Sequence, residues 1–197
     1  SGFRSKEFSG SGFNQMVMDD ATAQNRVQLY SSSTNAQLHL GYLIDHTGNT
    51  RGNFLGSGFD LSSEAYGALR AGRGLYVSTH PVASQPLDAR VASNQLVSSE
   101  GVLEAASQAS ETSQAESLKD GHAALKAFTD ATQHSEAGAT GGGGNTAGGG
   151  TGNANAFTQP VMLFAAPAGI ALSTQKSAHV ATDQHINLVS GQSTHIA

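Results

Sequence analysis

The sequence from Met162 to Ala197 reads MLFAAPAG IALSTQKS AHVATDQH INLVSGQS THIA when it is divided into octads, which are consecutive groups of eight residues. The first and third positions of these octads are mostly apolar. They are Met162, Phe164, Ile170, Leu172, Ala178, Val180, Ile186, Leu188, Thr194 and Ile196. Side chains alternate between the two faces of a strand, so residues two apart point the same way. Each octad therefore predicts a strand of about six residues and a turn of about two, with one apolar face.

A repeat of fixed period indicates an architecture in which one unit cannot bury its apolar face alone. A single chain would leave the apolar stripe and both strand edges exposed. Three copies around a threefold axis would bring the stripes together and pair the edges. We therefore expect a mainly β fold, a trimeric intertwined β-prism needle; an intrachain β-helix is the competing geometry, although short β-helix repeats usually have six or nine residues. The expected trimer core consists of Met162, Phe164, Ile170, Leu172, Ala178, Val180, Ile186, Leu188 and Ile196.

Residues 1–80 are expected to form an N-terminal β region of the needle. Val27-Gln28-Leu29-Tyr30 and Leu38-His39-Leu40 alternate apolar and polar side chains, which predicts strands, and Asp45–Asn49 predicts a turn. The spacing of eight also appears here. It relates Phe59, Gly67 and Leu75, and also Leu61, Leu69 and Val77.

Residues 81–137 are expected to form a helical insertion, because Ala, Ser, Gln and Glu dominate its central part. Leu96 and Leu103 lie seven residues apart, as do Leu118 and Leu125, which gives a narrow apolar stripe. Ser117 and Asp120 resemble a capping box, so the pattern predicts two helices. Such a hairpin suits packing against another element; a role in docking a partner stays open.

Residues 138–156 are expected to be a flexible linker, because glycine dominates them. The stretch has no Lys followed by Ser or Thr after its last glycine, so it does not match a phosphate-binding loop. Residues 157–197 would then form the octad-repeat β-prism tip.

The composition excludes several classes of function. The 197-residue chain has no cysteine, which rules out disulfides, thiol catalysis and thiolate metal sites. Its net charge of −5 with ten Lys and Arg residues offers no basic surface for nucleic acid. No apolar run approaches the roughly 20 residues of a membrane span. The first residues lack the apolar segment of a signal peptide and do not begin with Met, so we expect a part of a longer polypeptide.

Several histidines and carboxylates are candidates for metal binding or catalysis. His179, His185 and His195 fall at outward-facing octad positions, so we expect solvated histidines and no metal site. Asp19 and Asp20 are adjacent and would point to opposite faces of a strand, which favours a structural role over acid–base catalysis. No placed nucleophile or triad can be named. We therefore expect neither an enzyme nor a bound cofactor.

Five segments and the octad repeat together resemble a known family. The segments are Gly12–Asp20 (GFNQMVMDD), Gln37–Gly41 (QLHLG), Gly58–Leu61 (GFDL), Arg70–Leu75 (RAGRGL) and Ala165–Leu172 (AAPAGIAL). The repeat is similar to the needle of phage tail spikes. The whole pattern, which spans nearly the entire chain, resembles the C-terminal part of VgrG proteins, the tip of the type VI secretion system.

The resemblance implies a homotrimeric needle on a contractile injection machine, a puncturing device that carries effector cargo. It implies assembly in the bacterial cytoplasm, secretion through the type VI system without a signal peptide, and only transient membrane penetration. The hub and oligonucleotide-binding-fold barrel, which would meet the secretion tube proteins, are absent from this sequence. A small conical PAAR-repeat protein would cap the needle, and the expected docking surface is Thr194, His195, Ile196 and Ala197. The alternatives are a fused effector or cell-wall hydrolase domain, and a cargo-binding adaptor.

Overall fold

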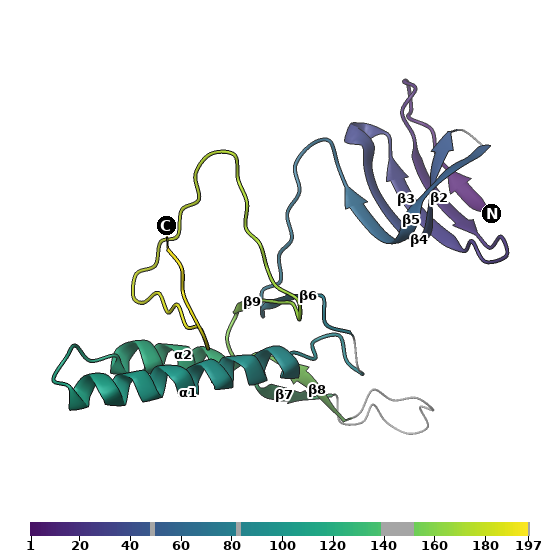
Figure 1. The fold of residues 1–197 in the computed structure, drawn as a ribbon. Coiled ribbons are helices and arrows are strands. Elements are labelled where there is room, and N and C mark those ends of the chain that lie inside the picture. The colour runs from purple at the N-terminus through teal and green to yellow at the C-terminus, as the bar shows by residue number, and fades with distance from the viewer. Residues whose placement is uncertain (48–49, 82–83, 139–151, 197) are drawn as a thin grey trace. The chain divides into compact units, whose positions relative to one another are not determined.

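A computed structural model describes residues 1–47, 50–81, 84–138 and 152–196 (Figure 1). The chain divides into two compact units, residues 1–69 and residues 70–197. The first contains a five-stranded sheet, and the second combines two helices with two small sheets.

The first unit is an antiparallel sheet with strands in sequence order, β1-β2-β3-β4-β5. Its elements are β1 (Gly2–Arg4), β2 (Asn14–Asp19), β3 (Arg26–Ser31), the 3₁₀ turn η1 (Ser33–Asn35), β4 (Ala36–Thr47) and β5 (Thr50–Ser62). Strands β3 and β4 confirm the two strands that the alternation predicts. The turn expected at 45–49 lies partly outside the described residues, but β4 and β5 that flank it pair antiparallel.

The distal halves of β4 and β5 depart from a regular ladder. Register shifts occur between Leu43 and Ile44 and again beyond Ile44, and Gly41 has a φ of 90°, which favours glycine. Tyr42 stacks on Phe54 with ring centroids 4.5 Å apart. Ile44 is buried, whereas its partner strand leaves Leu55 exposed. The extra residues of these bulges lie on β5, and a bulge bends the strand that carries it.

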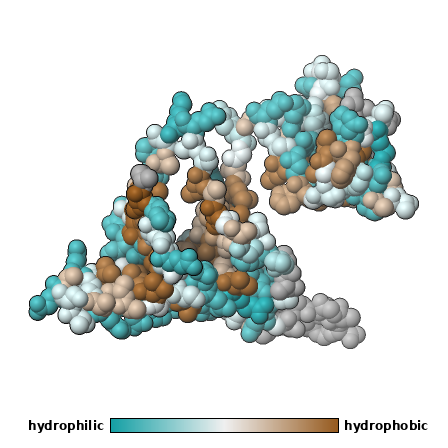
Figure 2. All heavy atoms as spheres, viewed as in Figure 1, coloured by the Kyte–Doolittle hydropathy of each residue, from teal (hydrophilic) through white to brown (hydrophobic). Residues whose placement is uncertain are grey.

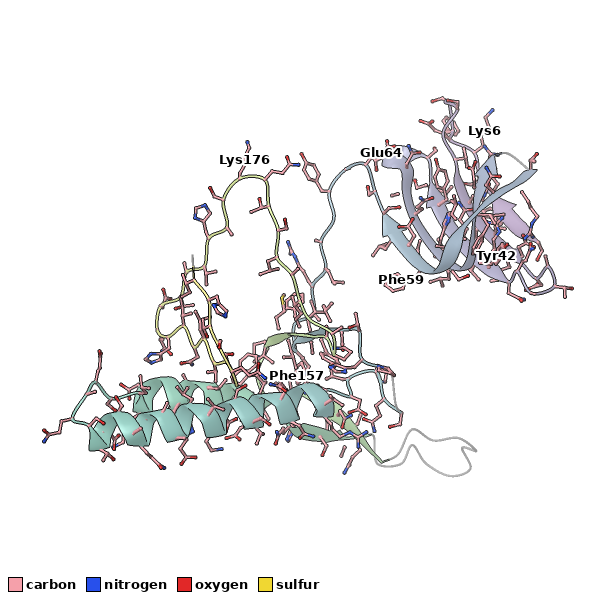
Figure 3. The ribbon with its side chains drawn as sticks, viewed as in Figure 1. Lys6, Tyr42, Phe59, Glu64, Phe157 and Lys176 are labelled. Carbon is pink, nitrogen blue, oxygen red and sulfur yellow. The ribbon has the colours of Figure 1, made fainter. Side chains whose placement is uncertain are left out.

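The second unit contains a helical hairpin packed on a two-stranded parallel sheet. Helices α1 (Arg90–Thr112) and α2 (Lys119–Thr132) lie side by side, and strands β6 (Leu75–Ser78) and β9 (Met162–Ala165) pair in parallel. Their common core contains Ala89, Ala92, Phe157 and Leu163, with Tyr76, Leu87, Leu96, Phe128, Val161 and Ala165 packed around it. Phe157 lies beside α1 (Figure 3). Two helices resting on another element are what the sequence predicts.

The start of α2 differs from the expected capping box. The position before α2 is Leu118, which makes no side-chain cap. The Ser117 hydroxyl instead accepts a hydrogen bond from the Lys119 N–H at 3.3 Å, two residues on. A Ser hydroxyl that bonds so near in sequence forms a local turn and does not reach the amide of Asp120. The prediction of two helices holds, but this detail of the signal was wrong.

A second hairpin flanks the glycine-rich segment. Strands β7 (His134–Ala137) and β8 (Asn153–Ala156) pair antiparallel, and the Gly138 N–H donates to the Gly152 carbonyl at 2.7 Å. Residues 153–156 were expected to belong to the linker, yet they form β8. The ladder with β7 supplies the backbone partners that composition alone does not reveal. Residues 139–151 lie outside the described residues.

Candidate functional site

One face of the first unit's sheet is apolar and exposed. The cross-strand register aligns two rows on this face: Phe3–Met16–Leu29–Leu38–Leu61, and Met18–Val27–Leu40–Phe59. Phe59 is 76% exposed and Leu61 is 70% exposed. Phe59 projects from the sheet in Figure 3, and hydrophobic residues lie at the surface in Figure 2. A single chain therefore leaves an apolar surface uncovered, which is typical of an interaction site.

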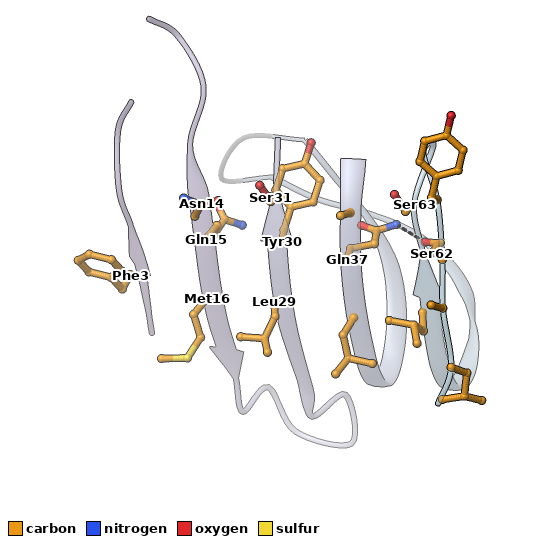
Figure 4. Close-up of a pocket in the computed structure, with 17 residues that line it drawn as sticks. Phe3, Asn14, Gln15, Met16, Leu29, Tyr30, Ser31, Gln37, Ser62 and Ser63 are labelled. Carbon is orange, nitrogen blue, oxygen red and sulfur yellow. Dashed lines mark hydrogen bonds between the residues drawn. The ribbon is translucent and has the colours of Figure 1, made fainter. Parts of the chain in front are cut away.

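This apolar face is also hollowed. A groove of about 1090 Å³ runs along the first row and is bounded by the segment 66–69 that follows β5 (Figure 4). Phe3, Met16 and Leu29 lie along it, and polar side chains such as Asn14, Gln37 and Ser62 form its other rim. We refer to the two rows and this groove as the apolar face.

The apolar pairs in these strands share the spacing of the octads. Met16 and Met18 in β2 are two residues apart, as are Leu38 and Leu40 in β4. Phe59 and Leu61 in β5 repeat the arrangement. Because residues two apart lie on one face of a strand, each strand carries the same pair that each octad carries. The pattern thus begins well before residue 162.

In the second unit, β6 and β9 bring two octad segments into register. Leu75 is paired with Met162, and Val77 with Phe164, so equivalent octad positions lie side by side although the helical insertion separates them in sequence. The intervening residues of both strands face the helices: Leu163 is buried in the core and Tyr76 packs against it. Met162 and Phe164, which were expected to form the trimer core, are more than half exposed on the other face.

The remaining octad residues are exposed as well. Residues 166–196, all described, contain no helix or strand. The expected core residues there are exposed throughout: Ile170, Leu172, Ala178, Val180, Ile186, Leu188 and Ile196. Thr194 and His195 of the expected tip surface are also exposed, and Ala197 lies outside the described residues. The octad positions are therefore available to a partner, but a single chain does not bring them together.

One contact joins the octad segment to the helices. The Asn187 side-chain amide donates to the Gly121 carbonyl of α2 at 3.0 Å. Asn187 lies between Ile186 and Leu188, the apolar pair of its octad, so on a strand it would point to the opposite face. The contact shows that an outward position can be used for packing against the helical hairpin. In the sequence, only the glycine at position 121 hints at this contact.

Metal-ligating side chains do not cluster among the described residues. Groups of three or more His, Asp or Glu side chains able to hold a metal ion are missing from this part of the chain. His179, His185 and His195 are exposed, as expected of solvated histidines. In the described ranges, neither helix has the length and hydrophobicity needed to cross a membrane.

Asp19 has a structural role in the first unit. Its carboxylate accepts a hydrogen bond from Arg26 Nε at 3.3 Å and pairs with the Arg51 guanidinium, which ties the β4–β5 hairpin to β2. Burial raises the pKa of Asp19, but the hydrogen bonds from Arg26 and the Ala21 N–H, with the charges of both arginines, outweigh it and hold the pKa below its ordinary value. Asp19 is the last residue of β2. The expectation of a structural role over acid–base catalysis agrees with this geometry.

The family follows from a match over most of the chain. Residues 6–137 match the family described as type VI secretion system Rhs element Vgr. The chain belongs to the Vgr family. The matched residues include the apolar face apart from Phe3, and the helical hairpin. Residues 149–197, which contain the octads, match a second family described as an uncharacterized protein conserved in bacteria (DUF2345).

Two curated members of this group share part of the sequence. The chain is 43% identical over 76 residues to the type VI secretion system spike protein VgrG2a of Pseudomonas aeruginosa. The matched residues make up 39% of this chain and 9% of VgrG2a. It is equally identical over 76 residues to the spike protein VgrG2b of the same organism, 7% of whose length is covered. The chain thus matches less than a tenth of each of these Vgr relatives.

Two solved structures share the fold. One is the VgrG spike from the type VI secretion system, with a TM-score of 0.69 and 18% identity over 100% of this chain and 64% of that chain. The other is the VgrG spike with the Tle1 effector bound, with a TM-score of 0.72 and 18% identity over 100% of this chain and 52% of that chain. At this identity the likeness shows that the chain has the fold of a Vgr spike.

Proposed function

We propose that this chain is the needle part of a homotrimeric type VI secretion spike, a structural device that punctures a target envelope and delivers effectors. The observation that carries the proposal is the exposed apolar pair repeated in β2, β3, β4, β5, β6, β9 and the octads. Three chains would cover these pairs by packing them around one axis. The needle's work would be mechanical, because strand pairing between chains gives rigidity.

The proposal fits what the separate chain leaves unsatisfied. A two-stranded parallel sheet such as β6–β9 has two open edges, and parallel strands are usually buried among others. Residues 166–196 have no ladder of their own. Neighbouring copies would supply both the missing strand partners and the apolar cover. The expected trimer core, from Met162 to Ile196, would then lie on the axis.

The partners follow from the same reasoning. A prism that stops near Ile196 would expose three strand ends and a small apolar triangle, which suits a capping protein. We infer that Thr194, His195, Ile196 and Ala197 dock one PAAR-repeat cone per trimer. Effectors would travel with the spike, and hub domains outside this sequence would join it to the secretion tube. The assembled spike would leave the bacterium through the type VI system and meet membranes only in passing.

A fused hydrolase and a cargo-binding adaptor are the two alternative functions. A fused hydrolase would need converging titratable groups in a pocket, and the large groove of the first unit is lined by apolar and neutral polar side chains. A cargo-binding adaptor is compatible with the needle and would use the helical hairpin. No geometric observation favours either over the spike.

The proposal can be tested by cross-linking, because the chain has no cysteine of its own. In a trimer Leu188→Cys would place three thiols near one axis, and mild oxidation would join two chains in a covalent dimer. The matched variant His179→Cys lies at an outward position and should stay unlinked. Equal cross-linking of both variants, or of neither, would contradict the proposed axis.

The tip assignment has its own test. The trimer can be compared with a chain that lacks its last eight residues, 190–197, for binding to a cognate PAAR-repeat protein by calorimetry. We expect one PAAR protein per trimer, and none after truncation. Unchanged binding by the truncated chain would refute the docking residues, and three PAAR proteins per trimer would refute the geometry.

A further inference from the structure

The face of the first unit opposite the apolar face carries a polar cleft. The register Arg4–Gln15–Tyr30–Gln37 forms one row of its floor, and Gln28 and His39 belong to the next row. The bent β4–β5 hairpin adds a wall that contains Asp45. The enclosed volume is about 440 Å³, enough for one sugar-sized ring. We call this space the polar cleft.

The cleft holds amide groups with unused hydrogen-bonding capacity. Gln28 is only 6% exposed, and its Oε1 accepts a hydrogen bond from Gln15 Nε2 at 3.5 Å. Among the described residues, Gln28 Nε2 and Gln15 Oε1 have no protein partner. Whichever way the two amides are oriented, one NH₂ group and one carbonyl remain available. These open groups can hydrogen-bond a ligand or a water molecule that enters the cleft.

Aromatic rings border the same cleft. Phe13 and Tyr30 are in contact, with ring centroids 5.5 Å apart, and the Arg4 guanidinium lies 3.4 Å from the Phe13 ring centroid. The Tyr30 hydroxyl donates to Asn35 Oδ1 at 2.6 Å, which fixes the ring. A fixed ring beside open amides offers an apolar surface for C–H groups and polar partners for hydroxyls.

The chemistry of the cleft excludes other classes of ligand. The floor lies mainly on strands β2, β3 and β4, which are paired on both sides. The edge strand β1 contributes only Arg4, so an extended peptide finds little free backbone edge there. Arg4 is balanced by Asp45, so the lining carries no net positive charge for a phosphate backbone. An apolar ligand would bury the Gln15 and Gln28 amides without partners. A neutral molecule rich in hydroxyl groups satisfies all three constraints.

We propose that the polar cleft binds one ring of a neutral oligosaccharide. Gln15 and Gln28 hydrogen-bond its hydroxyls, Asp45 accepts a further hydroxyl proton, and Tyr30 packs against the ring. Side chains on a strand alternate between faces, so the cleft faces away from the apolar face. Assembly of three chains through the apolar face therefore leaves three clefts open, and binding at three sites strengthens weak single contacts.

Saturation-transfer NMR on the full chain tests this proposal with three neutral probes: cellotriose, maltotriose and triacetylchitotriose. We expect transfer to at least one of them, with shifts of glutamine side-chain amide signals in the ¹⁵N spectrum. Gln15→Leu keeps the side chain's size but removes its polar atoms, and should weaken binding about tenfold. Asp45→Asn should weaken it less, and Gln175→Leu, an exposed glutamine of the second unit, should not change it.

The test separates the possible outcomes. Circular dichroism verifies that each variant is folded. Asp45→Asn alters an exposed side chain near the end of β4 and keeps the test valid if Gln15→Leu unfolds. Absence of transfer with all three sugars overturns the proposal, as does unchanged affinity in folded Gln15→Leu. Binding of tetra-alanine in place of a sugar would show a peptide site and overturn it too. If the chain does not form a trimer, each cleft is still intact and can still bind a sugar. Failure of the spike proposal can therefore be distinguished from failure of the sugar-binding proposal.

Discussion

Leu188→Asp is the sharpest perturbation of the proposed axis. Leu188 belongs to the last complete octad and is 71% exposed in the single chain, so a trimer would remove this surface from water. Its neighbour Asn187 contacts α2 and is not a neutral control. His179→Ala, at an exposed outward position beside Val180, serves instead.

The size of the effect can be estimated from burial. Complete burial of a leucine contributes about 1.5–3 kcal/mol, so covering this fraction contributes about 1–2 kcal/mol per chain and about 3–6 kcal/mol per trimer. At about 1.4 kcal/mol per tenfold change, Leu188→Ala should lower the trimer association constant by about two to four orders of magnitude. Leu188→Asp should abolish assembly, because it also brings three unpaired carboxylates into an apolar site.

Sedimentation equilibrium over a range of concentrations measures this constant directly. We expect the unmodified chain and His179→Ala to associate equally, Leu188→Ala to dissociate at higher concentration, and Leu188→Asp to stay monomeric. If Leu188→Asp assembled as tightly as the unmodified chain, Leu188 would not lie at an interface. The inference that the first and third octad positions face the trimer axis would then fail.

Three further predictions concern other parts of the chain. Gly101→Ala should stabilise α1 by about 0.5–1 kcal/mol, whereas Gly121→Ala should gain less because its Cβ would lie 2.8 Å from Asn187 Oδ1; equal gains in urea unfolding would contradict this. The lowered pKa of Asp19 means that its stabilising effect is complete above the unfolded pKa of about 4 and is lost as the pH falls through the folded value. Asp19→Asn should therefore lack this part of the acid transition, and an unchanged acid titration would refute it. Removing four residues from 140–152 should change the free energy of unfolding by less than about 1 kcal/mol, since closure entropy depends weakly on length; a larger loss in thermal melts would show that the tract makes ordered contacts.

The local elements could be predicted from the sequence because they depend on local signals. Alternation at 27–30 and 38–40 identified β3 and β4, since period two is specific to strands. Two pairs of leucines seven residues apart, Leu96 and Leu103 and then Leu118 and Leu125, identified the helical hairpin. Leucines at this spacing form an apolar stripe on a helix, and such a stripe packs against another element. Both signals lie within a few residues of the structure they specify.

The pairing of distant segments could not be predicted in the same way. Parallel pairing of β6 with β9 joins residues 75–78 to 162–165 across the helical insertion, and no local signal specifies a partner so far away. The polar cleft depends on the register shifts near Ile44, where β5 carries extra residues, and on the cross-strand register of the other strands. The two apolar rows were visible as pairs such as Met16 and Met18, but only the register shows that they share one face.

The central claim is that three chains cover one another's apolar pairs, and the molar mass of the purified chain in solution tests it most directly. Light scattering coupled to size exclusion should give about three times the chain mass of 20.1 kDa at micromolar concentration. A folded, stable species of 20.1 kDa across that range would contradict the account.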